Sequence, residues 1–262
     1  MTNSIAALQA TVRRLGEERF AHADCIFLCG SVVRGEASPT SDLDLVVLFA
    51  HVDAAWRESF TFESWPVECF CHDLETAEYY FTELDRPSGV GGLTHMVVEG
   101  IPVPNETPLA RQLRRRAQAN YDAGPTPWTP AELDYSRYTI SGLMDDLRGA
   151  RTQAETNAIA TVLYSLLGNH VFRRRNRWTA HGKTLLRRLQ RFDATLAGQY
   201  EAAFSNTFSN AFSNAFSNAF STGNTATLLT LCADIIKADG GYLFDGYRPV
   251  ADVAHRKTVI EK

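Results

Sequence analysis

Residues 25–49 read CIFLCGSVVRG, then EASPTS, then DLDLVVLF. Two apolar runs typical of buried strands flank a Gly30-Ser31 turn, and two carboxylates open the second run. Because side chains alternate across a strand, Asp42 and Asp44 share one face while Leu43 points to the other. Two carboxylates held this close repel each other unless a cation lies between them. The pattern therefore predicts a cation site at the start of a strand.

The side chains around this turn favour Mg²⁺ and a phosphate as ligands. Carboxylate oxygens, with coordination positions left for water and phosphate, suit Mg²⁺ better than Zn²⁺. Gly30 lets the backbone approach a phosphate, and Ser31 offers both an N–H and a hydroxyl as donors. Arg34 adds a planar, permanently charged donor. The alternative is that Asp42 and Asp44 are only solvent-facing positions of an edge strand.

Residues 25–72 resemble the nucleotidyltransferase superfamily of the DNA polymerase beta type, which includes the two-domain kanamycin (aminoglycoside) nucleotidyltransferases. The shared signature is Gly-Ser, a short helix and an acid-x-acid strand. The resemblance implies a third carboxylate on a neighbouring strand, for which Glu68 is the candidate and Asp73 the fallback. It also implies a phosphate-binding lysine in a helical second domain, and Lys183, at the end of the basic segment 173–183, is the candidate. A solvated basic turn is the alternative for that segment.

The resemblance implies transfer of a nucleoside monophosphate from a nucleoside triphosphate, with ATP as the expected donor, to a hydroxyl of a small-molecule acceptor such as an antibiotic. Pyrophosphate is the expected leaving group. Asp42, Asp44 and Glu68 would bind two Mg²⁺ ions. The proton of the acceptor hydroxyl would pass to Glu68 or to a carboxylate of the helical domain such as Asp145 or Asp146. The sequence leaves the acceptor, the preferred base of the nucleotide and the oligomeric state open.

Other functions compete with this interpretation. A nucleotide-binding regulatory or toxin–antitoxin module with weak or no catalysis would keep the fold, but the intact Gly-Ser turn and the three acids argue against it. Nucleotide addition to RNA or protein would suit the basic segment, yet no aromatic residues are interleaved among its arginines, so nucleic acid is not an expected partner. Zinc binding by Cys25, Cys29, Cys69 and Cys71 conflicts with spacings that fall within strands.

Composition sets broader limits. The chain has 262 residues, 45% of them hydrophobic, without a secretory signal or a bilayer-length apolar run, so we expect a cytoplasmic protein. Five cysteines, an odd number, indicate reduced thiols. Residues 1–105 carry 6 basic and 16 acidic side chains, whereas residues 106–200 carry 15 and 8. An acidic region followed by a basic region is typical of a cleft that binds metal and triphosphate. Two ordinary solvated surfaces would give the same numbers of charged side chains.

Hydrophobic periodicity predicts an α+β protein with a mixed β-sheet and flanking helices over residues 1–105, then an antiparallel helical bundle over residues 106–262. The expected strands are 25–29, 42–49, 58–64 and 67–72. The expected helices include 74–84, 89–100, 109–121, 132–148 and 185–196. Residues 204–220 repeat the unit Phe-Ser-Asn-Ala, whose phenylalanines drift by about 40° per step on a helix. A helix extension and a mobile insert are equally compatible with this repeat, and no functional role is expected for it.

Overall fold

The computed structural model describes residues 4–213 and 225–249. The chain divides into two compact units, residues 1–126 and 127–262. The sequence placed the boundary between residues 105 and 106. Helix α6 (Pro108–Ala123) accounts for the difference, because its buried Leu113 and Ala117 pack into the core of the first unit with Phe27.

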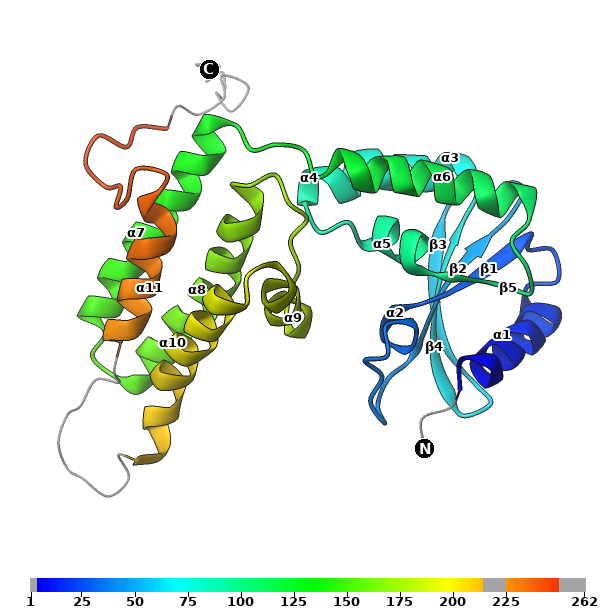
Figure 1. The fold of residues 1–262 in the computed structure, drawn as a ribbon, viewed down its shortest axis with the longest axis horizontal. Coiled ribbons are helices and arrows are strands. Elements are labelled where there is room, and N and C mark those ends of the chain that lie inside the picture. Colours follow the sequence, from blue (N-terminus) through cyan, green and yellow to red (C-terminus); the bar gives the residue numbers. More distant parts are fainter. Residues whose placement is uncertain (1–3, 214–224, 250–262) are drawn as a thin grey trace, which may run out of the picture. The chain divides into compact units, whose positions relative to one another are not determined.

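A five-stranded mixed sheet forms the centre of the first unit (Figure 1). The strand order is β3-β4-β2-β1-β5, in which β2 and β4 run parallel and the other neighbouring pairs are antiparallel. The strands are β1 (Cys25–Cys29), β2 (Leu43–Leu48), β3 (Trp56–Phe62), β4 (Trp65–His72) and β5 (Ile101–Val103). The central strands β1 and β2 are buried on both faces, as their unbroken apolar runs predict.

Helices cover both faces of this sheet (Figure 1). On one face, helix α1 (Ile5–Arg19) contacts β1 and β5, and its Val12 and Leu15 join Leu43 and Leu45 in one buried cluster. The other face packs against α6 and against three short elements that precede it. These are α3 (Leu74–Tyr79), the π-helix η1 (Tyr80–Asp85) and α5 (Gly92–Glu99), with α4 (Arg86–Ser88) between η1 and α5. Asp44 follows Leu43 in the strand and therefore lies on this second face.

Strand β5 was missed by the sequence interpretation, which expected a helical stretch to residue 100 and a break at the following prolines. Ile101–Val103 instead pairs with β1 as the edge strand of the sheet. Pro102 is compatible with that place, because an edge strand leaves one row of backbone groups unpaired and needs no donor there.

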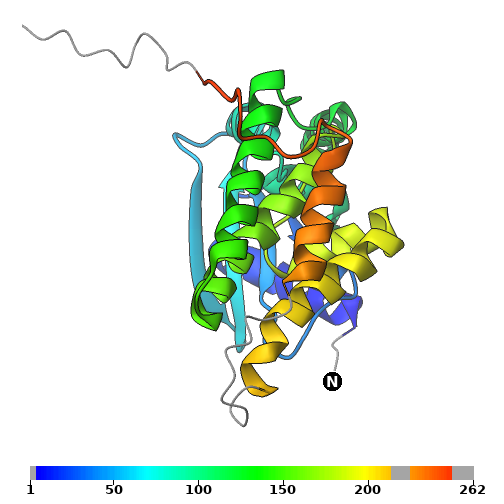
Figure 2. The same cartoon turned by 90° about the vertical axis from the view of Figure 1, so that its left-hand side faces the viewer.

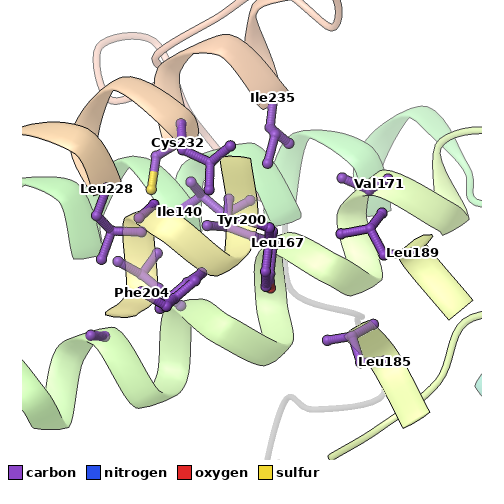
Figure 3. Packing of buried hydrophobic residues seen from close by; sticks show 14 of the residues in the cluster. Ile140, Leu167, Val171, Leu185, Leu189, Tyr200, Phe204, Leu228, Cys232 and Ile235 are labelled. Atoms are coloured by element: carbon purple, nitrogen blue, oxygen red, sulfur yellow. The ribbon is translucent and has the colours of Figure 1, made fainter. Parts of the chain in front are cut away.

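The second unit is helical. It contains α7 (Pro130–Gly149), α8 (Gln153–Arg173), α9 (Lys183–Phe192), α10 (Ala194–Ser213) and α11 (Ala226–Lys237). Helices α7 and α11 run side by side (Figure 2), and a three-residue connection joins α7 to α8. Figure 3 shows the core that α7, α8, α10 and α11 share, to which these helices contribute the fully buried residues Ile140, Leu167, Tyr200 and Leu228.

Two details of this unit correct or refine the sequence interpretation. The expected helix 185–196 is interrupted, because Asp193 takes an extended conformation and accepts a hydrogen bond from the Leu196 N–H at the start of α10. The Phe-Ser-Asn-Ala repeat begins inside α10, where Phe204 is 3% exposed and Phe208 is 37% exposed. That change matches the predicted drift of a four-residue period. Residues 214–224, the rest of the repeat and the linker to α11, lie outside the described residues.

The prediction of an α+β protein followed by a helical region is confirmed. All five cysteines are buried and free of disulfides, as expected for reduced thiols. Across residues 4–213 and 225–249, none of the helices has the length and apolarity needed to cross a bilayer.

Candidate functional site

The turn after β1 is shaped by Gly30, the first residue of the short helix α2 (Gly30–Val33). Its φ of +75° belongs to the left-handed region that favours glycine. A Cβ at this position would lie 1.9 Å from Asp44 Oδ2. Gly30 thus leaves the space that the Asp44 carboxylate fills, a requirement that the sequence did not reveal.

Three carboxylates meet beside this turn, the two that share a strand face and the third for which the resemblance made Glu68 the candidate. Asp42 immediately precedes β2 and Asp44 is its second residue, and parallel pairing of β2 with β4 places Glu68 opposite Asp44. One oxygen from each of Asp42, Asp44 and Glu68 lies within 4.8 Å of the other two. All three side chains are half-buried. We call these three residues the carboxylate cluster.

The cluster is electrostatically unfavourable by itself. Burial, followed by the negative charges of Asp42 and Glu68, raises the pKa of Asp44 to about 6, while Arg34 and Arg57 oppose the rise. A divalent cation would offset this repulsion. The donor set, three carboxylate oxygens without sulfur or imidazole, fits Mg²⁺.

Ser31 and Arg34 organise the loop that leads to the cluster. The Ser31 hydroxyl donates to Ser41 Oγ at 3.2 Å, and the Ser31 carbonyl accepts from the Glu36 N–H at 2.9 Å. Arg34 forms ion pairs with Glu36 at 3.3 Å and with Glu99, the last residue of α5, at 3.2 Å. Two of the predicted phosphate-binding side chains therefore lie within one turn of Gly30, Ser31 in α2 and Arg34 as its C-cap.

Asp73, the fallback for the third carboxylate, has a different place. It is the N-cap of α3, where its side chain accepts the Thr76 N–H at 2.9 Å and the Val52 N–H at 3.0 Å. A buried cap that satisfies two backbone donors is a structural role. Glu68, and not Asp73, belongs to the carboxylate cluster.

The remaining predicted residues belong to the second unit. Lys183 is exposed and begins α9 directly after Gly182, which has a φ of +52°. Asp145 accepts hydrogen bonds from Tyr242 and Arg148, both at 2.5 Å. Asp146 is exposed on α7. The roles of Lys183, Asp145 and Asp146 stay predictions.

The zinc alternative is not supported. Within residues 4–213 and 225–249, the carboxylate cluster is the one group of three or more His, Cys, Asp or Glu side chains that could share an ion. Burial raises the pKa of the Cys25 thiol to about 11 and that of Cys71 to about 12, with Coulombic repulsion adding to both. These cysteines act as small apolar core residues.

The geometry of the turn and cluster agrees with the family comparison. Residues 16–80 match the nucleotidyltransferase domain. The matched range contains the Gly30-Ser31 turn and the whole carboxylate cluster, so the expected resemblance holds at the level of this domain. The kanamycin-like subtype stays a prediction.

Two further comparisons add little to the domain match. None of the curated proteins compared with the chain matches it. Among solved structures, a nucleotidyltransferase-like protein from Exiguobacterium sibiricum 255-15 is similar over 88% of this chain and 75% of its own, with 10% identity and a TM-score of 0.42. So weak a likeness carries no functional argument.

One residue beside the cluster was not anticipated. Arg57, on β3, donates from Nη2 to Glu68 Oε2 at 2.6 Å. The turn between β3 and β4 consists of Glu63 and Ser64, both with positive φ. Because Glu-Ser is not a typical sequence for such a turn, the hairpin register that brings Arg57 to Glu68 was not readable beforehand. The alternation of Ser59 and Thr61 with Phe60 and Phe62 was the available signal for a strand.

Proposed function

We propose that this protein transfers a nucleoside monophosphate from a nucleoside triphosphate, with ATP as the expected donor, to a hydroxyl group of a small-molecule acceptor. The observation that carries the proposal is the convergence of Asp42, Asp44 and Glu68 within 4.8 Å, inside a matched nucleotidyltransferase domain. Antibiotics such as aminoglycosides are one expected class of acceptor.

The carboxylate cluster would hold Mg²⁺, in two ions if the resemblance extends that far. When bound, Mg²⁺ neutralises phosphate charge and makes the α-phosphorus easier to attack. The Ser31 N–H would donate to phosphate oxygens, and the Ser31 hydroxyl would do so in place of its present bond to Ser41. Arg34, in exchange for its ion pairs with Glu36 and Glu99, and Lys183 would pair with phosphate charge. Gly30 keeps the turn close to the cluster, because any side chain there would displace the Asp44 carboxylate.

The chemical step is a displacement at phosphorus. The acceptor oxygen forms a bond to the α-phosphorus, the bond from that phosphorus to the pyrophosphate oxygen breaks, and the hydroxyl proton moves to a carboxylate. Glu68, whose Oε2 accepts a hydrogen bond from Arg57, is one candidate base. Asp145 and Asp146 of the helical region are the other candidates that the resemblance offers.

Pyrophosphate release tests the proposal. The purified chain is incubated with Mg²⁺, each of the four nucleoside triphosphates and a panel of hydroxyl-bearing acceptors that includes aminoglycosides. We expect acceptor-dependent pyrophosphate release, which Asp44→Asn abolishes and Asp53→Asn, at a fully exposed loop position, retains. A nucleotide-binding module without catalysis would bind the triphosphate and release no pyrophosphate. Full turnover by Asp44→Asn would show that the cluster is not the site.

A further inference from the structure

Arg57 is held beside the carboxylate cluster by two contacts. Its Nη2 lies 2.6 Å from Glu68 Oε2, and its guanidinium carbon lies 5.0 Å from the centre of the Phe70 ring. The β3–β4 register pairs Arg57 with Phe70 and Ser59 with Glu68, so Arg57 and Glu68 are diagonal neighbours on one face of the hairpin. The ion pair and the ring together fix the position of the guanidinium.

The ion pair also restricts Glu68. A glutamate side chain has several rotatable bonds, and a charge-assisted hydrogen bond to one oxygen selects among its rotamers. With Oε2 bound to Arg57, Oε1 is the oxygen left for another ligand. The Glu68 side chain is 30% exposed, so solvent reaches it and other rotamers become accessible when Arg57 is removed.

We infer that Arg57 is a positioning residue, which holds Glu68 so that its second oxygen joins Asp42 and Asp44 in binding a divalent cation. This inference rests on the proposed function. Residues that orient a metal ligand from outside the coordination sphere change metal affinity by about 10- to 100-fold when replaced.

Repulsion between Arg57 and the cation acts in the opposite direction. The Arg57 side chain is 56% exposed, and solvent and salt screen a charge in that position. The hydrogen bond to Glu68 is short-ranged and keeps its orienting effect under the same conditions. Orientation therefore outweighs repulsion, and removal of Arg57 weakens cation binding.

Arg19, the last residue of α1, provides a matched control because it contacts the same hairpin. Its Nη2 lies 3.4 Å from Glu58 Oε2, and its guanidinium carbon lies 4.0 Å from the centre of the Phe60 ring. Its side chain is 46% exposed. Glu58 is the residue after Arg57, so it points to the opposite face of the strand, away from the cluster. Loss of Arg19 removes an arginine, an ion pair and a ring contact without touching Glu68.

The experiment measures Mn²⁺ affinity of the full chain by electron paramagnetic resonance of free Mn²⁺. We expect Arg57→Met to weaken binding at least about tenfold, Arg57→Lys to recover part of that loss, and Arg19→Met to bind as the wild type does. Circular dichroism at each titration temperature verifies folding. Should Arg57→Met fail to fold, Arg57→Lys decides the question, because it keeps the charge but loses the planar donor pair.

Unchanged or tighter Mn²⁺ binding by the folded Arg57 variants would overturn the inference and leave the proposed function standing. The Mn²⁺ affinity of Asp44→Asn is measured in parallel, so that failure of the inference about Arg57 can be distinguished from failure of the proposed function. If Asp44→Asn binds Mn²⁺ as the wild type does, the cluster is not the cation site, and both the inference and the proposed function fall.

Discussion

Replacement of Gly30 by alanine tests how closely the turn and the cluster are matched. An alanine Cβ would lie 1.9 Å from Asp44 Oδ2 and 2.8 Å from Asp44 Cγ. Ordinary van der Waals contact begins at 3.4 Å. The Asp44 Oδ2 atom must therefore move away by about 1.5 Å, the difference between 3.4 Å and 1.9 Å. A misplacement of about 1 Å at a reacting centre costs about 100-fold in rate, so we expect at least that loss of turnover.

Gly30→Ala also strains the backbone, since the residue has a φ of +75°. A side chain in the left-handed region costs about 1–2 kcal/mol in the free energy of unfolding. Gly35→Ala isolates this effect, because Gly35 has a φ of +70° and an alanine Cβ there would have no other atom within 4 Å. Both variants should lose stability, Gly30→Ala the more because its overlap with Asp44 adds to the backbone strain, but only Gly30→Ala should lose activity.

The assays are urea unfolding for stability and pyrophosphate release for turnover, with Mn²⁺ affinity as a readout independent of the acceptor. We expect Mn²⁺ binding to weaken in Gly30→Ala and to stay at the wild-type value in Gly35→Ala. Equal turnover and equal Mn²⁺ affinity in the two variants would refute the reasoning, because the displaced Asp44 carboxylate would then have no consequence.

Three further predictions concern stability. Without metal, Asp44→Asn should be more stable than the wild type by about 1 kcal/mol at pH 8. In the folded protein Asp44 takes up a proton as the pH falls through its raised pKa of about 6, and the unfavourable charge disappears. The stability advantage of Asp44→Asn over the wild type should therefore vanish near pH 4 in thermal unfolding. Burial lowers the pKa of His72 to about 4, so between pH 7 and pH 5 the wild type should lose about 2 kcal/mol more stability than His72→Gln in urea unfolding. Asp85 accepts the Thr94 N–H and hydroxyl, both at 2.7 Å, in a buried site, so Asp85→Ala should cost about 2–3 kcal/mol by urea unfolding, and a loss below about 0.5 kcal/mol would contradict this.

Much of the fold was predictable because apolar periodicity reports burial directly. The runs at 25–29 and 42–49 predicted strands that are buried on both faces, and those strands lie at the centre of the sheet. The break at Asp193 could have been recognised, because aspartate followed by helix-forming residues is a helix N-cap signal. Strand β5 could not have been recognised from the sequence, since three residues that include Pro102 form a strand only through pairing with β1.

The site divides in the same way. The acid-x-acid pattern predicted that Asp42 and Asp44 share a face, because that relation is local to one strand. The place of Glu68 opposite Asp44 depends on parallel pairing of β2 with β4. Periodicity does not show which strands pair, so Glu68 was indicated by the family resemblance. The contact of Arg57 with Glu68 depends on the register of a hairpin whose turn sequence is unusual.

The sequence by itself determined the secondary-structure class, the two regions of opposite charge and the pair of aspartates on one strand face. Each of these follows from composition or from the fixed geometry of a strand or helix, which act over a few residues. Only the tertiary structure decided that Gly30 must lack a side chain to admit Asp44, that α6 belongs to the first unit, and that Arg57 reaches Glu68. These relations join residues that are distant in the chain, and their distances are set by strand register and core packing, which no local pattern encodes.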